Sequence, residues 1–253
     1  MFKVATTTLS FKDHFSEQST HYAKYRPRYP AELFQFVADQ CRRRELAWDC
    51  ATGSGQAAVA LGELFETVIA TDASDTQIAC AMPHAKVSYR VATAEVSGLD
   101  HASVDALTVG QALHWFDRER FYAEARRVLA PGGLLAAWCY GLCQVTDACD
   151  AVVDELYSDI VHDFWPAERR HVVDGYAGIA MPAAEIDVPR MNMCADWAVD
   201  DILGYLRTWS ACGRYQKAHA RDPVALIEGE LHDAWGTGSR LVRWPLTLKV
   251  CRF

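Results

Sequence analysis

The sequence predicts an α/β fold built on a doubly wound sheet of about seven strands, with helices on both faces and an antiparallel last strand. Three observations indicate this fold. Short apolar runs alternate with helical patterns from residue 46 to residue 138, a glycine-rich turn follows the first run, and an alternating apolar run closes the chain. The 253 residues are 51% hydrophobic and 23% charged, so they can bury a sizeable core.

The first part of the sheet should contain five strands. Their apolar runs lie at residues 46–50, 67–71, 87–91, 104–109 and 134–138. The helices between them should begin near Gln56, Ser74 and Asp117, and Pro131-Gly132-Gly133 should end the last helix and form a turn. Residues 30–44 have the apolar spacing of a further helix that packs on the sheet.

Beyond residue 138 the pattern changes to amphipathic helices, at about 147–163, 200–207 and 223–235, with a strand-like stretch at 184–194. Residues 244–253 alternate with a period of two and should pair antiparallel with 184–194. No repeat or linker composition marks a boundary, so we expect one domain. It comprises an N-terminal lid and helix (1–45), a cofactor-binding core (46–142), a helical cap with one sheet strand (143–243) and the closing strand (244–253).

Charge and composition argue against several classes of protein. A formal net charge of -8 disfavours a broad nucleic-acid surface. No run resembles a signal peptide or approaches about 18 apolar residues, so a cytoplasmic protein without a membrane partner is expected. Nine cysteines without a CxxC pair indicate reduced thiols. Cys139 and Cys143 could share a helix face, but no His or Cys nearby completes a metal set, so no metal site is expected.

The glycine-rich segment Trp48-Asp49-Cys50-Ala51-Thr52-Gly53-Ser54-Gly55-Gln56 runs from a strand into a helix. Glycines there let a ligand approach the backbone closely. Nicotinamide, flavin and S-adenosylmethionine (SAM) enzymes all use such loops, and a mere tight turn is the structural alternative. The acid Asp49 and a spacing shorter than GxGxxG favour SAM.

Acidic residues follow the next two strands. Asp72 ends the second strand about 20 residues after the glycine loop, where an acid binds ribose hydroxyls or caps the next helix. Ala94 and Glu95 follow the third strand, where they could meet an adenine edge, although Glu95 could equally be a surface acid.

The fourth strand leads into Gly110-Gln111-Ala112-Leu113-His114-Trp115-Phe116-Asp117. In an open α/β sheet this turn faces the ligand. His114 could contact the substrate, act as a base, or only hydrogen-bond within the turn. Trp115 and Phe116 are more suited to form a wall than to catalyse.

Taken in this order, these segments resemble the class I SAM-dependent methyltransferases of the methyltransferase-11 type. The resemblance includes a further segment before the fifth strand, Arg127-Val128-Leu129-Ala130-Pro131-Gly132-Gly133. Tyr22-Ala23-Lys24-Tyr25-Arg26-Pro27-Arg28-Tyr29-Pro30 and Tyr205-Leu206-Arg207-Thr208-Trp209-Ser210-Ala211 look similar to the subgroup of trans-aconitate methyltransferase. The resemblance spans nearly the whole chain. One departure is Ala51, which stands where the family's Asp-x-Gly-x-Gly-x-Gly loop has its first glycine.

The resemblance implies a Rossmann-like fold, SAM as cofactor and S-adenosyl-L-homocysteine as product. It implies that Asp49 orients the ammonium of SAM, that Asp72 binds the ribose, and that His114 points toward the acceptor. Further contacts to the cofactor are implied for Ala51, Thr52, Gly53 and Gly55 (methionine part), Ala73, Gln77, Ala94 and Glu95 (adenine), and Gln111 and Ala112 (sulfonium). The resemblance also implies that the N-terminal segment forms a lid over the cofactor, with contacts from Tyr22, Tyr25 and Arg28. The alternative is that these side chains only pack an N-terminal helix.

Methyl transfer from a sulfonium requires alignment of the acceptor and exclusion of water. A hydroxyl acceptor needs a base, whereas a carboxylate does not. We expect Arg28, Arg207 and Arg214 nearest the acceptor pocket, or else an aromatic wall. That wall would comprise Trp115, Trp209 and Tyr215. Residues 143–243 and 22–30 should form a lid that brings Trp209 or Arg214 to the pocket, and the alternative is a layer that only covers the sheet.

The sequence therefore favours a methyltransferase that acts on a carboxylate or hydroxyl oxygen of a small molecule. A SAM-binding protein without turnover and a methyltransferase acting on a protein side chain are the alternatives. A nicotinamide oxidoreductase and a nucleic-acid methyltransferase fit less well, because the loop spacing is short and no basic face is evident. The identity of the acceptor and the oligomeric state stay open.

Overall fold

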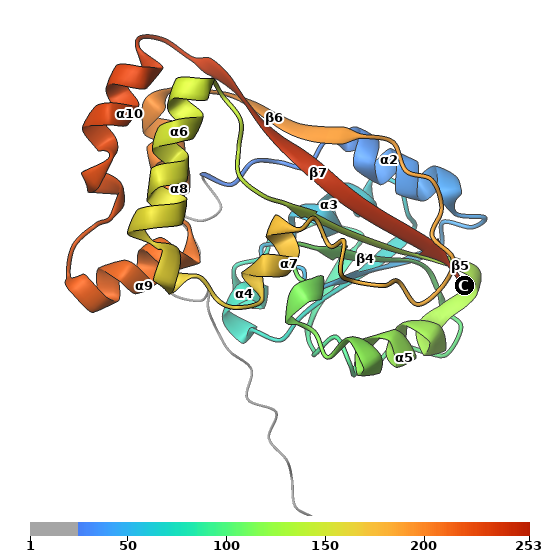
Figure 1. Ribbon diagram of the computed structural model, residues 1–253. Helices are drawn as coiled ribbons and strands as arrows, with labels where there is room; N and C mark the ends of the chain where they lie inside the picture. Colours follow the sequence, from blue (N-terminus) through green and yellow to red (C-terminus); the bar gives the residue numbers. More distant parts are fainter. Residues whose placement is uncertain (1–24) are drawn as a thin grey trace, which may run out of the picture.

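The computed structural model describes residues 25–253 (Figure 1). Its centre is a seven-stranded sheet in the order β3-β2-β1-β4-β5-β7-β6. The strands are β1 (Leu46–Cys50), β2 (Thr67–Asp72), β3 (Val87–Val91), β4 (Val104–Gly110), β5 (Leu129–Tyr140), β6 (Met191–Trp197) and β7 (Arg240–Arg252). The first five strands are parallel, and β7 runs antiparallel to both of its neighbours. The Rossmann-like α/β fold with an antiparallel last strand is confirmed.

Helices connect these strands and extend beyond them. They are α2 (Ala31–Gln40), α3 (Gln56–Gly62), α4 (Asp75–Ala79), α5 (Arg118–Val128), α6 (Asp147–Glu155), α7 (Arg169–Val173), α8 (Val199–Arg207), α9 (Ser210–His219) and α10 (Glu228–Trp235). Short turns of other helix types are η2 (Leu113–Trp115), η3 (Leu156–Ile160), η4 (His162–Phe164) and η5 (Val224–Leu226). The helix starts expected near Ser74 and Asp117 are confirmed, because both residues are N-caps whose side chains accept a backbone N–H.

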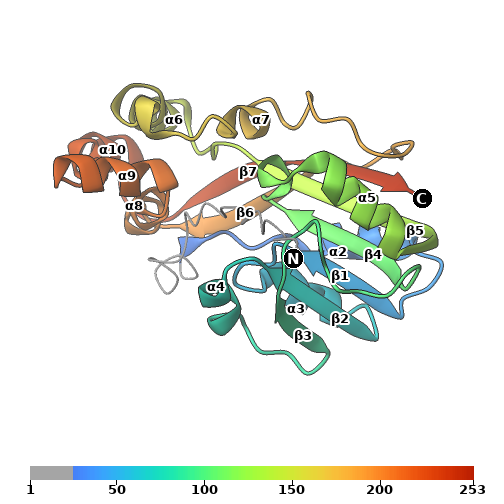
Figure 2. The same cartoon turned by 90° about the horizontal axis from the view of Figure 1, so that it is seen from below.

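Alternate residues of the central strands pack on opposite faces of the sheet. Trp48 and Leu107 pack with Phe121 of α5 on one face, whereas Ala47 and Ala106 pack with α2 and α3 on the other. Figure 2 shows α5 and α7 on one side of the sheet and α2 and α3 on the opposite side. Both faces are therefore buried, which explains why β1 and β4 are buried along nearly their whole length.

The helices α6, α8, α9 and α10 lie together at one end of β6 and β7 (Figure 1). We call these four helices, with η3, η4 and η5, the cap. Its core contains buried Trp235, Tyr205 and Trp209 and is continuous with Tyr140 at the end of β5 and Trp244 of β7. The cap is thus anchored to the sheet through shared apolar packing.

Several expected elements differ from the structure. The closing strand expected at 244–253 begins earlier, at Arg240, and the helix expected at 147–163 ends at Glu155 and is followed by η3. The strand expected at 184–194 is instead Met191–Trp197, and the residues before it pair with β7 through an isolated bridge between Glu185 and Cys251 rather than through a ladder. Pro189 explains the shift, because proline cannot donate a hydrogen bond to a ladder. The turn Pro131-Gly132-Gly133 interrupts β5 rather than preceding it, since Gly132 and Gly133 hydrogen-bond with Phe253.

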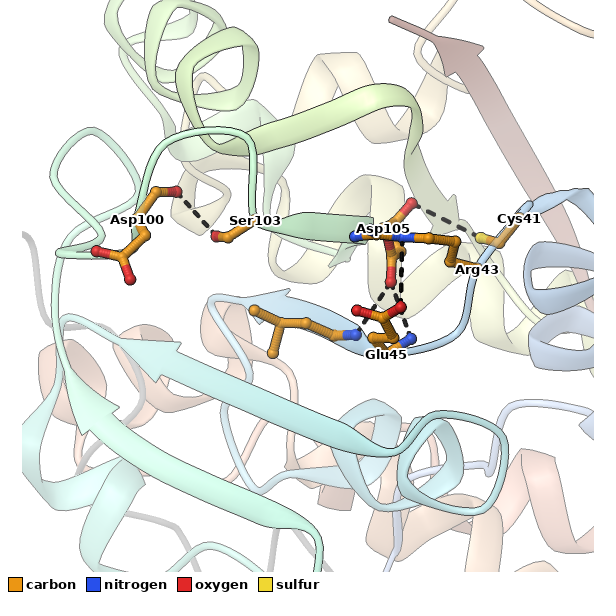
Figure 3. Close-up of polar contacts among 7 residues, drawn as sticks. Cys41, Arg43, Glu45, Asp100, Ser103 and Asp105 are labelled. Atoms are coloured by element: carbon orange, nitrogen blue, oxygen red, sulfur yellow. Dashed lines mark hydrogen bonds and ion pairs between the residues drawn. The ribbon is translucent and has the colours of Figure 1, made fainter.

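The edge of the sheet opposite the glycine loop is fixed by Asp105, close to the start of β4 (Figure 3). Its buried carboxylate accepts the backbone N–H groups of Glu45 and Leu46, at 2.8 and 3.1 Å. Arg43 donates to the same carboxylate from Nε and Nη2, at 3.2 and 3.1 Å. These bonds join the start of β1 to β4.

Candidate active site

The loop after β1 adopts a backbone conformation that favours glycine. Ala51, Gly53 and Gly55 have φ values of 56°, 55° and 81°. A left-handed conformation costs a residue with a Cβ about 1–2 kcal/mol, so Ala51 is strained where the family loop has glycine. The N–H of Thr52 donates to the carbonyl of Thr71 at 2.9 Å, which holds the loop at the carboxyl end of β2.

Asp49 lies in β1 directly below this loop and is 1% exposed. The Thr52 hydroxyl donates to its Oδ2 at 2.6 Å, and the Thr108 hydroxyl of β4 donates to its Oδ1 at 2.7 Å. Burial raises the pKa of Asp49 to about 6, although these two hydrogen bonds act in the opposite direction. A cation bound beside this carboxylate would therefore favour its ionised form.

Asp72, at the end of β2, joins two loops. Its Oδ2 accepts the backbone N–H of Gly53 and its Oδ1 that of Ser74, each at 2.9 Å. The buried Gln77 of α4 lies nearby, with its Oε1 at 4.0 Å from the position a Cβ on Gly53 would occupy. The half-buried Ala73 completes this turn. The carboxylate thus lies where the carboxyl ends of β1 and β2 meet.

The loop after β3 is attached to α5 by an acidic network. Glu95 accepts the backbone N–H of Asp117 at 3.2 Å, and Ala94 beside it is buried. Glu124 of α5 accepts both the N–H and the hydroxyl of Ser97, at 2.9 and 2.5 Å. Hydrogen bonds from Arg127 lower the pKa of Glu124 to about 2. This network was not predicted from the sequence, although the spacing of Glu124 and Arg127 is typical of a helical ion pair.

The turn after β4 is also strained. Gln111 has φ of 56°, and its side chain donates to the Tyr140 carbonyl at 3.0 Å and accepts the Tyr140 N–H at 3.3 Å. The buried Ala112 precedes η2, which carries His114. His114 is 8% exposed, and burial lowers its pKa to about 3, with Arg169 and His171 acting in the same direction. The imidazole is therefore neutral near pH 7.

A pocket that is partly open to solvent lies between this turn and the cap. It is lined by Arg26, Gln111, His114, Trp115, Tyr140, Gly141, Trp165, Pro166, Arg169, Tyr205, Trp209 and Ser210. Aromatic rings and two guanidinium groups dominate this lining, and none of these residues is acidic. The pocket therefore suits a ligand that combines an apolar part with a negative charge.

Comparison with known proteins identifies the family. The model of the family Methyltransf_11, described as a methyltransferase domain, matches residues 48–137. A Dictyostelium discoideum protein named as a methyltransferase is 35% identical over 235 residues, which cover 91% of this chain and 89% of its own. The chain belongs to the class I SAM-dependent methyltransferases.

Solved structures agree with this assignment. One from Anaeromyxobacter dehalogenans, described as a type II methyltransferase, is 44% identical to this methyltransferase. It has a TM-score of 0.85, and the match covers 90% of this chain and 98% of that one. A structure from Anabaena variabilis is 16% identical with a TM-score of 0.54, over 88% and 98% of the two chains, and shows the fold alone.

The arginines of the methyltransferase pocket are not those expected. Arg28 is exposed, Arg214 donates to the Phe164 carbonyl at 3.0 Å, and neither lines this pocket. Arg207 also lies elsewhere, in ion pairs with Asp222 and Glu228.

Arg26 and Arg169 take their place. Arg26 donates to the Tyr140 hydroxyl at 3.1 Å, and Arg169 lies 4.9 Å from the centre of the Trp165 ring. Arg26 belongs to the opening motif that the sequence analysis quoted, but only folding shows that it, rather than Arg28, faces inward.

The aromatic residues divide between the pocket and the cap. Trp115 and Trp209 line the pocket, whereas Tyr215 packs against Phe164 and His219 elsewhere in the cap. Trp209 is 4% exposed and packs among the rings of Tyr157, Trp165 and Tyr205, with centroids 5.6–5.9 Å apart.

The N-terminal segment docks on the cap. A Cβ on Gly204 of α8 would lie 2.6 Å from the Tyr25 ring, so this glycine allows the close contact. Arg26 donates to the Thr208 carbonyl at 3.3 Å. Tyr22, the other tyrosine expected in the lid, lies outside the described residues.

Between residues 25 and 253, no group of three or more His, Cys, Asp or Glu side chains could hold a metal ion. In the same part of the chain, no helix is both long and apolar enough to cross a membrane.

Proposed function

We propose that this methyltransferase moves the methyl group of SAM to an oxygen of a small-molecule acceptor, with a carboxylate favoured over a hydroxyl. The pocket beside Gln111 carries the proposal, because the described residues that line it include Arg26 and Arg169 within an aromatic wall and none of them is acidic. Guanidinium groups bind carboxylates through paired, charge-assisted hydrogen bonds. The resemblance to trans-aconitate methyltransferase agrees with this class of acceptor.

The residues at the carboxyl ends of β1 and β2 fit SAM. Asp49 and Asp72 offer carboxylates for an ammonium group and a pair of ribose hydroxyls. Among residues 25–253, the nearest atom to a Cβ placed on Gly53 would be Gln77 Oε1 at 4.0 Å, so this part of the structure leaves room for a ligand beside the backbone. Bound SAM supplies a methyl group on a sulfonium, which is a good leaving group.

The remaining cofactor residues border this space. We assign the methionine part to the loop Ala51–Gly55 and the adenine to the turns that carry Ala73, Gln77, Ala94 and Glu95. The sulfonium then lies beside Gln111 and Ala112. Since the Gln111 side chain is engaged by Tyr140, its backbone is the part that borders the cofactor.

The state of His114 favours a carboxylate acceptor. A hydroxyl must lose a proton during transfer, whereas a carboxylate attacks as it stands. A histidine with a pKa of about 3 is a weak base at neutral pH. The chain would then align the acceptor, hold its charge and exclude water. Such positioning can lower the activation free energy by about 7–11 kcal/mol.

We assign the role of a roof over the acceptor to the cap and residues 25–30, within a single domain. Trp209 reaches the pocket from the start of α9, Trp165 from the segment before α7, and Arg26 from the N-terminal segment. Segments distant in sequence thus enclose one cavity.

A methyl-transfer assay tests this function. The protein is incubated with SAM carrying a labelled methyl group and with single acceptors, first trans-aconitate, then other carboxylic and hydroxy acids. We expect label in a base-labile methyl ester. Saturable SAM binding without product from any acceptor would indicate a SAM-binding protein without turnover, and label in added proteins would indicate side-chain methylation.

A further inference from the structure

Tyr176 holds an unusual backbone conformation next to the active site. It follows α7, is fully buried, and has φ of 56°, directly after Gly175 with φ of 55°. A bulky residue with positive φ is uncommon and costs about 1–3 kcal/mol, a strain that persists where surrounding contacts enforce it. Here the Tyr176 N–H donates to the His171 carbonyl at 2.7 Å, and its hydroxyl lies 3.0 Å from Nδ1 of His114. The strained turn brings a hydroxyl to the imidazole.

The direction of this hydrogen bond follows from counting protons. Among the described residues, Nδ1 of His114 is the one group that could accept the Tyr176 hydroxyl proton, because the backbone of Leu113 and His114 acts on this hydroxyl as a donor. If Nδ1 carried a proton, the phenol proton would be buried without an acceptor. If Nδ1 carries no proton, it can accept the phenol proton. The phenol oxygen can then accept from the backbone of Leu113 and His114. The second arrangement satisfies both groups.

The proton of the neutral ring then resides on Nε2. His114 lines the acceptor pocket, and no residue in the described range hydrogen-bonds its Nε2. The ring is held on its other side by Trp115, with centroids 4.7 Å apart. The group available to a ligand in the pocket is therefore an N–H donor.

We propose that Tyr176 is a positioning residue that donates to Nδ1 of His114 and fixes the Nε2–H tautomer, so that His114 offers the acceptor a hydrogen-bond donor rather than a base. The inference rests on the proposed function, in which the acceptor enters as a carboxylate. A donor beside the pocket would hold one carboxylate oxygen while the other attacks the methyl group.

Burial, and after it the charges around the pair, keep the ring neutral. Arg169 and His171 act on His114 and oppose a second proton, and Cys139 lies beside Tyr176. Burial raises the pKa of the Tyr176 hydroxyl well above its usual range, so the phenol retains the proton that it donates. Within the described part of the chain, the charged groups that act on His114 are Arg169 and His171, neither of which is acidic.

Nitrogen NMR of the histidine rings tests the tautomer without any acceptor. The full chain is labelled with ¹⁵N-histidine, and His114 is assigned from the spectrum of His114→Gln. In the wild type we expect a pyridine-like Nδ1 and a pyrrole-like Nε2. A pyrrole-like Nδ1 in the wild type would overturn the proposal, and this outcome does not depend on whether the protein turns over.

Removal of the hydroxyl provides the second readout. In Tyr176→Phe the two nitrogens should shift toward a mixture of tautomers, because the acceptor role of Nδ1 is no longer enforced. Tyr122→Phe is the matched control, since the Tyr122 hydroxyl donates to the Ala180 carbonyl and not to His114. An unchanged His114 spectrum in Tyr176→Phe would remove Tyr176 from this role. If that variant does not fold, the wild-type spectrum still decides the tautomer.

Kinetics with a carboxylate acceptor separate a donor from a base. Glutamine can donate from an amide nitrogen near the position of Nε2, whereas alanine cannot. A donor role predicts that kcat/KM of His114→Gln lies within about tenfold of the wild type and above that of His114→Ala. A base role predicts that both variants lose roughly 100- to 10,000-fold, which would contradict the proposal.

Discussion

Asp49 is the residue whose ionisation should couple to cofactor binding. Burial raises its pKa to about 6 in the free protein, and the ammonium of SAM would favour the carboxylate. Below pH 6 the proton must be displaced before SAM binds, so affinity should rise with pH through about 6 and level off above it. Calorimetry in buffers of different ionisation enthalpy should detect proton release near pH 6.

The same shift affects the stability of the protein without ligand. Because the folded pKa of about 6 exceeds the usual 3.8, this carboxyl stabilises the fold below pH 3.8 and loses that contribution as the pH rises through 6. Asp49→Asn should remove both pH dependences. A SAM affinity that stays constant from pH 5 to about 7 would contradict the placement of the ammonium beside Asp49.

Asp72 gives a test of the ribose assignment. Asp72→Ala should weaken SAM binding by about 1.5–3 kcal/mol, because hydrogen bonds to a charged group are lost. Asp75→Ala, which removes an exposed acid three residues away, should leave the affinity unchanged. Equal calorimetric affinities for the two variants would contradict the assignment.

The convergence of Asp49, Asp72 and His114 at one edge of the sheet could be predicted from the sequence, because these residues lie at or just after the carboxyl ends of parallel strands. Residues that only tertiary packing brings to this edge could not. Arg169 escaped prediction because α7 is only five residues long and its contact with the pocket depends on the cap. The strain at Ala51 was equally invisible, since a substitution for glycine in sequence does not reveal φ.

At the scale of elements, Asp105 should contribute to stability without affecting the site. Asp105→Ala would leave the buried N–H groups of Glu45 and Leu46 without their acceptor and should lower the free energy of unfolding by about 2–4 kcal/mol. Asp100→Ala, on the loop before β4, should change it by less than about 0.5 kcal/mol. Urea denaturation measures both, and SAM affinity should stay at the wild-type value. Loss of SAM binding in folded Asp105→Ala would contradict this separation.

The bounds of a helix or strand could be predicted where the apolar residues of the sequence match the positions that are buried in the structure. β1 and β3 have the expected bounds, because each is a short apolar or β-branched run between polar turns. β6 was displaced by Pro189, and α9 was not anticipated because only Ala211 and Cys212 of its ten residues are buried. A helix with so few buried positions has a weak apolar period.

At the scale of the whole molecule, a roof formed by the cap and residues 25–30 should affect turnover of the acceptor and leave binding of the cofactor nearly unchanged. Trp209→Ala should lower kcat/KM for the acceptor about tenfold or more while the SAM affinity changes by less than about threefold. Trp235→Ala is the matched control, because it removes a buried indole from the same cap core outside the pocket. If both variants lose turnover equally, Trp209 has only a packing role.

We propose that SAM lies along the carboxyl ends of β1, β2 and β4 with its sulfonium facing the pocket under the cap. A crystal structure with S-adenosyl-L-homocysteine would decide this. We expect ribose hydroxyls within hydrogen-bond distance of Asp72, the amino group beside Asp49, and the sulfur facing the cavity lined by His114 and Trp209. A cofactor bound elsewhere, or a sulfur facing away from that cavity, would show that this placement is wrong.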